Sequence, residues 1–198
     1  MKRYLAIWMP LVFGACTFLQ PVEDDPVRHL LEAKAPSGGS SSGGLSVAVA
    51  RPTLPPYLER VELVTRTEFG TLKVHENDLW SEPLDSAVGR VIADNLRRLK
   101  GSIDIQPSTN FISRDYSKLV EIRIERFDPL PDGNLVLECS WKVQTIGGGD
   151  ANSQTYRTVV PIENLEQDPN EIYSGKRERI VAMNEALLRL SKKIARKL

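Results

Sequence analysis

The side chains that could carry out chemistry in this chain are few and scattered. The sequence holds two histidines, His29 and His75, and two cysteines, Cys16 and Cys139. An enzyme at neutral pH needs a nucleophile, a base or a metal held at short range. Neither histidine lies at a sequence spacing from a cysteine, serine or aspartate that is typical of a known catalytic site. Two histidines far apart in the sequence also supply too few ligands to indicate a metal site. We therefore expect no catalytic residue, no cofactor and no metal site.

Two further features, a possible reactive thiol and a possible phosphate-binding loop, are better explained as structural elements. Cys139 lies in an alternating strand pattern, and a free cysteine in such a place is most often a buried small apolar side chain. The glycine run at residues 147–149 lacks the lysine and hydroxyl residue of a phosphate-binding loop, and it joins two expected strands instead of a strand and a helix. We interpret it as the tip of a hairpin.

The beginning of the chain has the pattern of an export signal. Lys2 and Arg3 precede a short apolar stretch that ends at Ala15, as in a secretory signal peptide, and the stretch is too short to span a bilayer. A cut after Ala15 places the bulky Phe13 at the −3 position, where ordinary signal cleavage prefers a small residue. The cut fits better with bacterial lipoprotein processing, in which diacylglycerol alkylates the thiol of the next residue, Cys16. A plain secreted protein is the alternative.

Lipidation of Cys16 would decide where the protein is located. Each buried methylene contributes about 0.8 kcal/mol, so two or more acyl chains hold a protein stably on a membrane. Thr17 follows Cys16, and by resemblance to bacterial sorting rules a residue other than aspartate favours the outer membrane. We expect residues 1–15 to be a lipoprotein signal peptide and residues 16–26 a lipidated tether. The domain would then face the periplasm.

Composition limits the remaining possibilities. Without the leader, which holds Lys2 and Arg3, the chain has 24 basic and 26 acidic residues among 183, a net charge of −2. A length of this order suits one domain. No basic stripe of the kind that binds nucleic acid is present, so we expect no nucleic-acid partner.

Two helices are expected. The first, at residues 82–100, has apolar residues at helical spacing, with Ser81 as its N-cap and Gly101 just after its end. The second is long, follows a cap pattern at residues 168–171, and ends in four cations. These cations suit the helix dipole in solvent, or they form a membrane or partner contact. They are Lys192, Lys193, Arg196 and Lys197.

The remaining periodic segments alternate as strands do. Strands are expected at residues 27–31, 45–50, 61–66, 71–74, 103–106, 119–127, 135–145 and 154–162. The third and fourth form a hairpin with Gly70 in its turn, and the last three form an antiparallel meander with one solvated face. The fold class is therefore α+β. We expect a single domain at residues 27–198, with a mainly antiparallel sheet and two helices packed on one face.

Two aromatic residues lie where a partner contact is plausible. Trp80 comes immediately before the first helix, where it either packs back near Leu84 as a hydrophobic staple or anchors an interface. Tyr57 lies in a proline-rich loop and is either packed or in contact with a partner. Both alternatives stay open at this point.

Several blocks of the sequence resemble one family. The blocks are Arg51-Pro52-Thr53-Leu54-Pro55-Pro56-Tyr57-Leu58, Arg60, Val64-Thr65-Arg66 and Trp80-Ser81-Glu82-Pro83-Leu84. They are similar to blocks of the PqiC-type lipoproteins, also described as the auxiliary lipoprotein component of ABC-type transport systems. The final helix is similar as well, so that the resemblance covers nearly all of the chain after the leader.

The resemblance implies a role in moving lipids between membranes. It implies an outer-membrane lipoprotein that works with an MCE-domain protein (PqiB-like) and its membrane permease. The protein would form a homo-oligomeric ring that docks or caps the MCE tunnel without enzymatic activity. Tyr57, Leu58, Arg66 and Trp80 are then the candidate interface residues. A stand-alone periplasmic lipoprotein that binds lipid or glycan, and an unrecognised hydrolase, are the alternatives.

Overall fold

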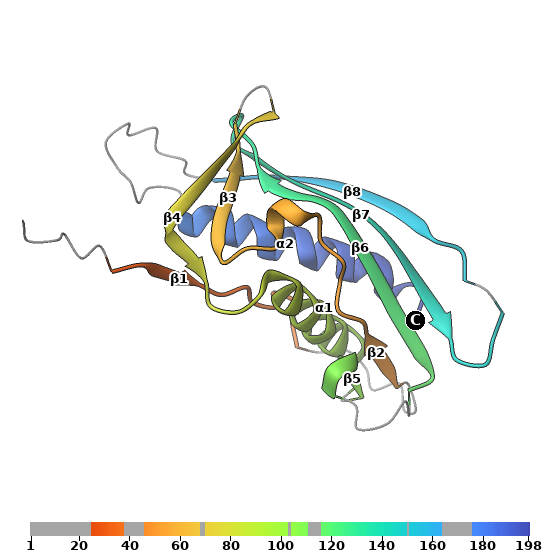
Figure 1. Ribbon diagram of the computed structural model, residues 1–198. Helices are drawn as coiled ribbons and strands as arrows, with labels where there is room; N and C mark the ends of the chain where they lie inside the picture. Colours follow the sequence, from red (N-terminus) through yellow and green to blue (C-terminus); the bar gives the residue numbers. More distant parts are fainter. Residues whose placement is uncertain are drawn as a thin grey trace, which may run out of the picture.

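Two mixed β-sheets and two long helices make up the domain. The computed structural model describes residues 25–37, 46–67, 70–102, 104–110, 116–149, 151–163 and 176–198. The larger sheet has five strands and the smaller has three. The α+β fold class and the single domain with two helices packed against sheets are confirmed (Figure 1). The signal peptide, Cys16 and the cap pattern at residues 168–171 lie outside the described residues.

The five-stranded sheet is built around a long meander. Its strands, in the order in which they pair, are β5 (Ile105–Pro107), β2 (Val47–Val49), β6 (Lys118–Pro129), β7 (Asn134–Thr145) and β8 (Gln154–Pro161). The pairs β6–β7 and β7–β8 are antiparallel, which confirms the predicted meander. Strand β2 instead lies parallel to both β5 and β6, which the sequence analysis did not foresee.

The two faces of the meander have opposite character. Val120, Ile122 and Ile124 of β6 point to the buried face. The other face carries ion pairs between neighbouring strands. Glu121 pairs with Lys142 across β6 and β7 at 2.8 Å, and Glu138 pairs with Arg157 across β7 and β8 at 2.8 Å. Opposite charges directly across a sheet suit solvent, so this face is the solvated one.

The smaller sheet has the order β1-β4-β3, formed by β1 (Val27–His29), β4 (Leu72–Trp80) and β3 (Glu62–Arg66). The predicted β3–β4 hairpin is confirmed, and Gly70 has the positive φ of 78° that its turn requires. The predicted end of β4 at residue 74 was wrong, because the strand continues to Trp80. It does so because β1 pairs with its last residues in parallel. Strand β1 ends at His29, two residues earlier than predicted.

Helices α1 (Leu84–Lys100) and α2 (Lys176–Ala195) pack against each other and cover the buried face of the larger sheet (Figure 1). Gly101 ends α1 with a φ of 61°, as predicted. The prediction of Ser81 as the N-cap was wrong, since Pro83 occupies that position without a side-chain cap. The backbone N–H of Ser81 instead donates to His29 O at 2.8 Å and thereby closes the β1–β4 pairing. Among the described residues, no helix is long and apolar enough to cross a bilayer.

Residues 30–35 form an extended strap that side chains of both helices hold in place. Its Leu31 and Ala35 side chains are buried. In α1, Arg90 donates to Leu31 O at 2.9 Å, Arg98 donates to Ala33 O at 2.9 Å, and Asn95 Oδ1 accepts from Ala35 N at 2.9 Å. In α2, Asn184 Oδ1 accepts from Glu32 N at 3.0 Å. Side chains of the two helices, instead of a sheet partner, thus satisfy these four backbone polar groups of the strap.

Candidate functional site

The proline-rich loop that carries the first family-like block lies along strand β6. Thr53 forms a single parallel bridge with Arg123. Its N–H donates to Ile122 O at 3.1 Å, and its carbonyl accepts from Ile124 N at 2.9 Å. The prolines on either side have no N–H to donate, so pairing stops there. The chain then turns through the short 3-10 helix η1 (Pro56–Leu58), which places Tyr57 over the end of β6.

A buried carboxylate, Asp128, gathers three side chains at this point. Its side chain is 0% exposed. Its oxygens accept hydrogen bonds from the Tyr57 hydroxyl, from Arg66 Nε at 2.9 Å and from Arg126 Nε at 3.3 Å. The Arg66 guanidinium also lies 5.4 Å from the centre of the Tyr57 ring, a cation–π distance. Because Arg66 belongs to β3 and Asp128 to β6, the cluster joins the two sheets.

Two of the four predicted interface residues, Tyr57 and Arg66, therefore meet at Asp128, which the sequence analysis missed. The strand expected at residues 119–127 ended one residue before Asp128. The strand in fact continues through Pro129, and a β-bulge between Ile124 and Arg126 places Phe127 on the buried face and Asp128 on the same face as Arg126. Asp128 is buried there because Tyr57 and Arg66 cover it, and neither the bulge nor this cover has a local sequence signal.

The surroundings of Tyr57 and Cys139 predict alkaline sensitivity. Burial, and then Asp128, raise the pKa of Tyr57 from 10.0 to about 12. Burial, and then Glu125, raise the pKa of the Cys139 thiol from 9.0 to about 12. The folded protein thus keeps protons that the unfolded chain releases. The free energy of unfolding is expected to be unaffected below about pH 9 and to fall as pH rises toward about 12.

Urea unfolding between about pH 8 and about pH 11 would measure this fall. A Cys139→Ala variant is expected to lose the part of the fall that begins near the ordinary pKa of a thiol. The same slope in this variant and in the wild type would contradict the assignment to Cys139.

A small hollow lies where the loop meets the start of α1. Its volume is about 410 Å³. Leu54, Leu58 and Leu84 form an apolar floor, while Arg60 and other charged residues lie at its rim. Val61, also part of the lining, is 61% exposed, the highest value among the exposed large apolar side chains of the described residues. Residues of two family-like blocks, 51–58 and 80–84, thus converge on this hollow.

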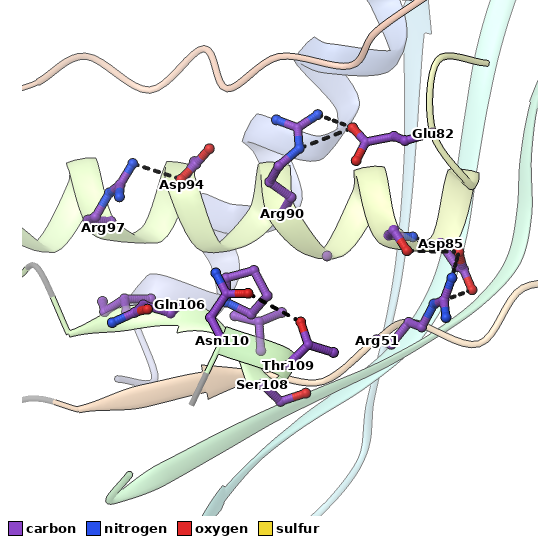
Figure 2. Close-up of a pocket in the computed structure, with 15 residues that line it drawn as sticks. Arg51, Glu82, Asp85, Arg90, Asp94, Arg97, Gln106, Ser108, Thr109 and Asn110 are labelled. Carbon is purple, nitrogen blue, oxygen red and sulfur yellow. Dashed lines mark hydrogen bonds and ion pairs between the residues drawn. The ribbon is translucent and has the colours of Figure 1, made fainter. Parts of the chain in front are cut away.

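A second, polar groove of about 600 Å³ runs along α1, opposite strand β5 and the 3-10 helix η3 (Ser108–Asn110). Figure 2 shows the charged side chains of α1 on one side and Gln106, Ser108, Thr109 and Asn110 on the other. The arginines of this groove are paired with neighbouring acids. Arg90 Nε donates to Glu82 at 3.1 Å, and Arg97 donates to Asp94 at 2.8 Å.

A bidentate ion pair between Arg51 and Asp85 lies between the hollow and the groove. Arg51 Nε lies 2.6 Å from one carboxylate oxygen of Asp85, and Arg51 Nη2 donates to the other at 2.9 Å (Figure 2). Both residues line both cavities. Both are also partly exposed, so the pair contributes at most about 1 kcal/mol and can open without disturbing the core.

The other two predicted interface residues are buried in the core. Leu58, the last residue of η1, is 4% exposed, and Trp80 is 6% exposed and belongs to the same core cluster as Leu84. These positions agree with packing, including the predicted contact of Trp80 near the start of α1. An interface role for Tyr57, Leu58, Arg66 and Trp80 stays a prediction.

The candidate catalytic groups have structural partners. His29 Nε2 lies 2.9 Å from Asp78 and ties β1 to β4, and His75 Nε2 lies 3.0 Å from the Thr65 hydroxyl across the hairpin. The raised pKa of Cys139 keeps that buried thiol protonated at neutral pH, where a nucleophile would need to be a thiolate. Within the described ranges, no three histidine, cysteine or acidic side chains gather as a metal would require.

The fold and the site thus define a small α+β domain with two hollows beside one helix and no assembled metal ligands among the described residues. The chain belongs to the family of ABC-type transport auxiliary lipoprotein components, whose model matches residues 29–195. Membership indicates a lipoprotein of the cell envelope with a transport-associated role.

Solved structures support the fold. A crystal structure of an uncharacterized protein has a TM-score of 0.67 at 17% identity, covering 86% of this chain and 96% of its own. A Xanthomonas campestris protein has a TM-score of 0.67 at 12% identity, covering 85% and 92%. A PelC dodecamer from Paraburkholderia phytofirmans has a TM-score of only 0.40 at 12% identity, covering 78% and 92%, too low to transfer its assembly. No curated protein gives a significant sequence match.

Proposed function

We propose that this protein is an outer-membrane-anchored, periplasm-facing lipoprotein subunit of an MCE-type inter-membrane lipid transport system. It docks or caps the tunnel of an MCE-domain protein (PqiB-like) that works with a membrane permease, and it assembles as a homo-oligomeric ring. Family membership over residues 29–195 is the single observation that carries the proposal. The expected lipidation at Cys16 and the sorting residue Thr17 add the location.

The hollow beside α1 supports a docking role. Residues from two family-like blocks line it, and it combines an apolar floor with a charged rim, as protein interfaces do. Val61 lies at its surface with 61% exposure, so a partner can cover this side chain without unfolding any part of the domain. The hollow is therefore the place where we expect the MCE-domain protein to make contact.

Co-purification of the full-length, lipidated protein with its MCE-domain partner after mild crosslinking tests the proposal. A Val61→Asp variant is expected to weaken binding at least about tenfold, since a charge would enter an apolar contact. Val181→Asp is the matched control, because Val181 is the same residue type and is 44% exposed on α2, outside the lining of the hollow. Repeated failure of the folded, lipidated protein to capture the partner, or equal effects of both variants, would count against the proposal.

A stand-alone binding lipoprotein is the second candidate. The two cavities, of about 410 and 600 Å³, lie within the size range of small-molecule sites. This alternative predicts a monomer that co-purifies with a lipid or glycan. Light scattering gives the mass of the assembly and native mass spectrometry detects a retained ligand, so the two measurements separate the candidates.

A further inference from the structure

The last turns of α2 carry a concentration of positive charge that the domain itself does not neutralise. Lys192, Lys193, Arg196 and Lys197, called here the basic end, are all exposed. None of them forms an ion pair with another described residue. Cations elsewhere in the described part of the chain commonly have an acidic partner, as the pairs Arg97–Asp94, Lys142–Glu121 and Arg157–Glu138 show.

Capping of the α2 dipole does not explain the basic end. The terminal carbonyls of the helix region already accept hydrogen bonds from lysines of other elements. Lys100 Nζ of α1 donates to Ala195 O at 3.3 Å, and Lys118 Nζ of β6 donates to Leu198 O at 2.7 Å. The basic end also places like charges four residues apart, and their repulsion offsets part of the stabilisation that cations near a helix end can contribute.

The type of surface that would complement the basic end follows from its surroundings. Within the basic end Ile194 is fully buried and Ala195 is partly buried, so the four cations make up most of what this segment exposes. The contact it can make is electrostatic, with groups that stay at the surface of a partner.

The basic end lies at the opposite end of the domain from β1, the strand that the tether precedes. The described chain enters the domain at β1, near the beginning of α2, where Arg179 is close enough to Asp78 of β4 for the two charges to interact. Arg179 lies 13 residues before Lys192, the first residue of the basic end, which corresponds to about 20 Å along the helix. Figure 1 shows β1 and the C-terminus at opposite ends of the molecule.

We propose that the basic end of α2 docks an acidic protein surface of the transport partner. This inference rests on the proposed function, in which a tether at the β1 side holds the domain on the outer membrane and the opposite end faces the periplasm. The hollow beside the start of α1 and the anchoring membrane both lie on the tether side, so the basic end provides a second contact with the partner, at the end of the domain that faces the periplasm.

The test uses the full-length, lipidated protein in nanodiscs of neutral phosphatidylcholine. One variant replaces Lys192, Lys193, Arg196 and Lys197 with glutamine. The control variant replaces four exposed cations spread over the domain with glutamine, namely Lys34, Lys73, Arg123 and Arg177. Each protein is titrated with poly-L-glutamate, with the MCE-domain partner and with vesicles containing phosphatidylglycerol, at low and high salt. Thermal melting checks that the variants are folded.

We expect the basic-end variant to bind poly-L-glutamate and the partner at least about tenfold more weakly, mainly through slower association, and high salt to reduce the difference. The control variant should bind as the wild type does. Unchanged poly-L-glutamate binding, or loss of vesicle binding alone, would overturn the inference. A wild type that ignores the partner but binds poly-L-glutamate through the basic end would support recognition of an acidic surface and refute the proposed function alone.

Discussion

Replacement of Asp128 with alanine is expected to lower the free energy of unfolding by about 3 kcal/mol. The substitution leaves Arg66 and Arg126 without their shared counter-charge and the Tyr57 hydroxyl without its acceptor, at a position that is 0% exposed. The value lies at the low end of the range for a broken buried ion pair. Both arginine side chains keep about a quarter of their surface in solvent (26% and 25%) and can recover some hydration.

Urea denaturation of the variant gives this free energy directly. Glu138→Ala is the matched control, because Glu138 and Arg157 form an exposed pair on the solvated face, and its loss should be below about 1 kcal/mol. Tyr57→Phe removes one hydrogen bond of the cluster and should lie between the two. Equal losses for Asp128→Ala and Glu138→Ala would show that Asp128 does not join the sheets energetically.

Replacement of Cys16 with alanine is expected to release the protein from the membrane fraction altogether. The reason is that each buried methylene contributes about 0.8 kcal/mol, so that two or more acyl chains on Cys16 would hold the protein stably on the membrane and their loss would remove this attachment. The released species should be soluble in the periplasm or remain unprocessed, and the domain should fold normally. Membrane fractionation and mass spectrometry of the mature protein measure both outcomes.

Cys139→Ala provides the control for this experiment, because it removes the other cysteine of the sequence while leaving the proposed lipidation site intact. It should fractionate with the membrane as the wild type does. A Cys16→Ala protein that has lost its leader and still remains in the membrane fraction, or a mature wild-type protein whose Cys16 sulfur is unmodified, would contradict the anchor.

The helices and the meander were predictable because their patterns are local. In α1, the apolar stripe read from the sequence is buried at Leu84, Val88, Val91, Ile92 and Leu96. In β6, strict alternation separated the buried face from the charged one. These elements each have enough residues for a periodic pattern to be recognised in a single segment.

The parallel pairings could not be predicted in the same way. Strands β1, β2 and β5 have three residues each, too few for a clear period, and their partners lie far away in the sequence. Strand β2 is buried at all three positions because it lies between two neighbours in the sheet, so alternation gives no guide there. Pairing between distant segments is decided by tertiary packing.

The candidate site was predicted only in part. Tyr57 and Arg66 were recognised from the family-like blocks, but the residue that brings them together, Asp128, lies in a different strand about 60 residues from Arg66. A bulge in that strand also changes the face on which Asp128 lies. The hollow and the groove depend on where the loop crosses α1, which no local pattern records. Sequence alone therefore identified side chains of the site without its centre.

The strap has a mechanical consequence. A force applied to the chain before β1 acts along the strand and reaches residues 30–35, whose backbone is hydrogen-bonded to side chains of both helices, namely Arg90, Arg98, Asn95 and Asn184. We expect these hydrogen bonds to share the load, so that several must break together. Because unfolding under force is governed by the unfolding rate, we expect the domain to unfold slowly when it is pulled from its amino-terminal side.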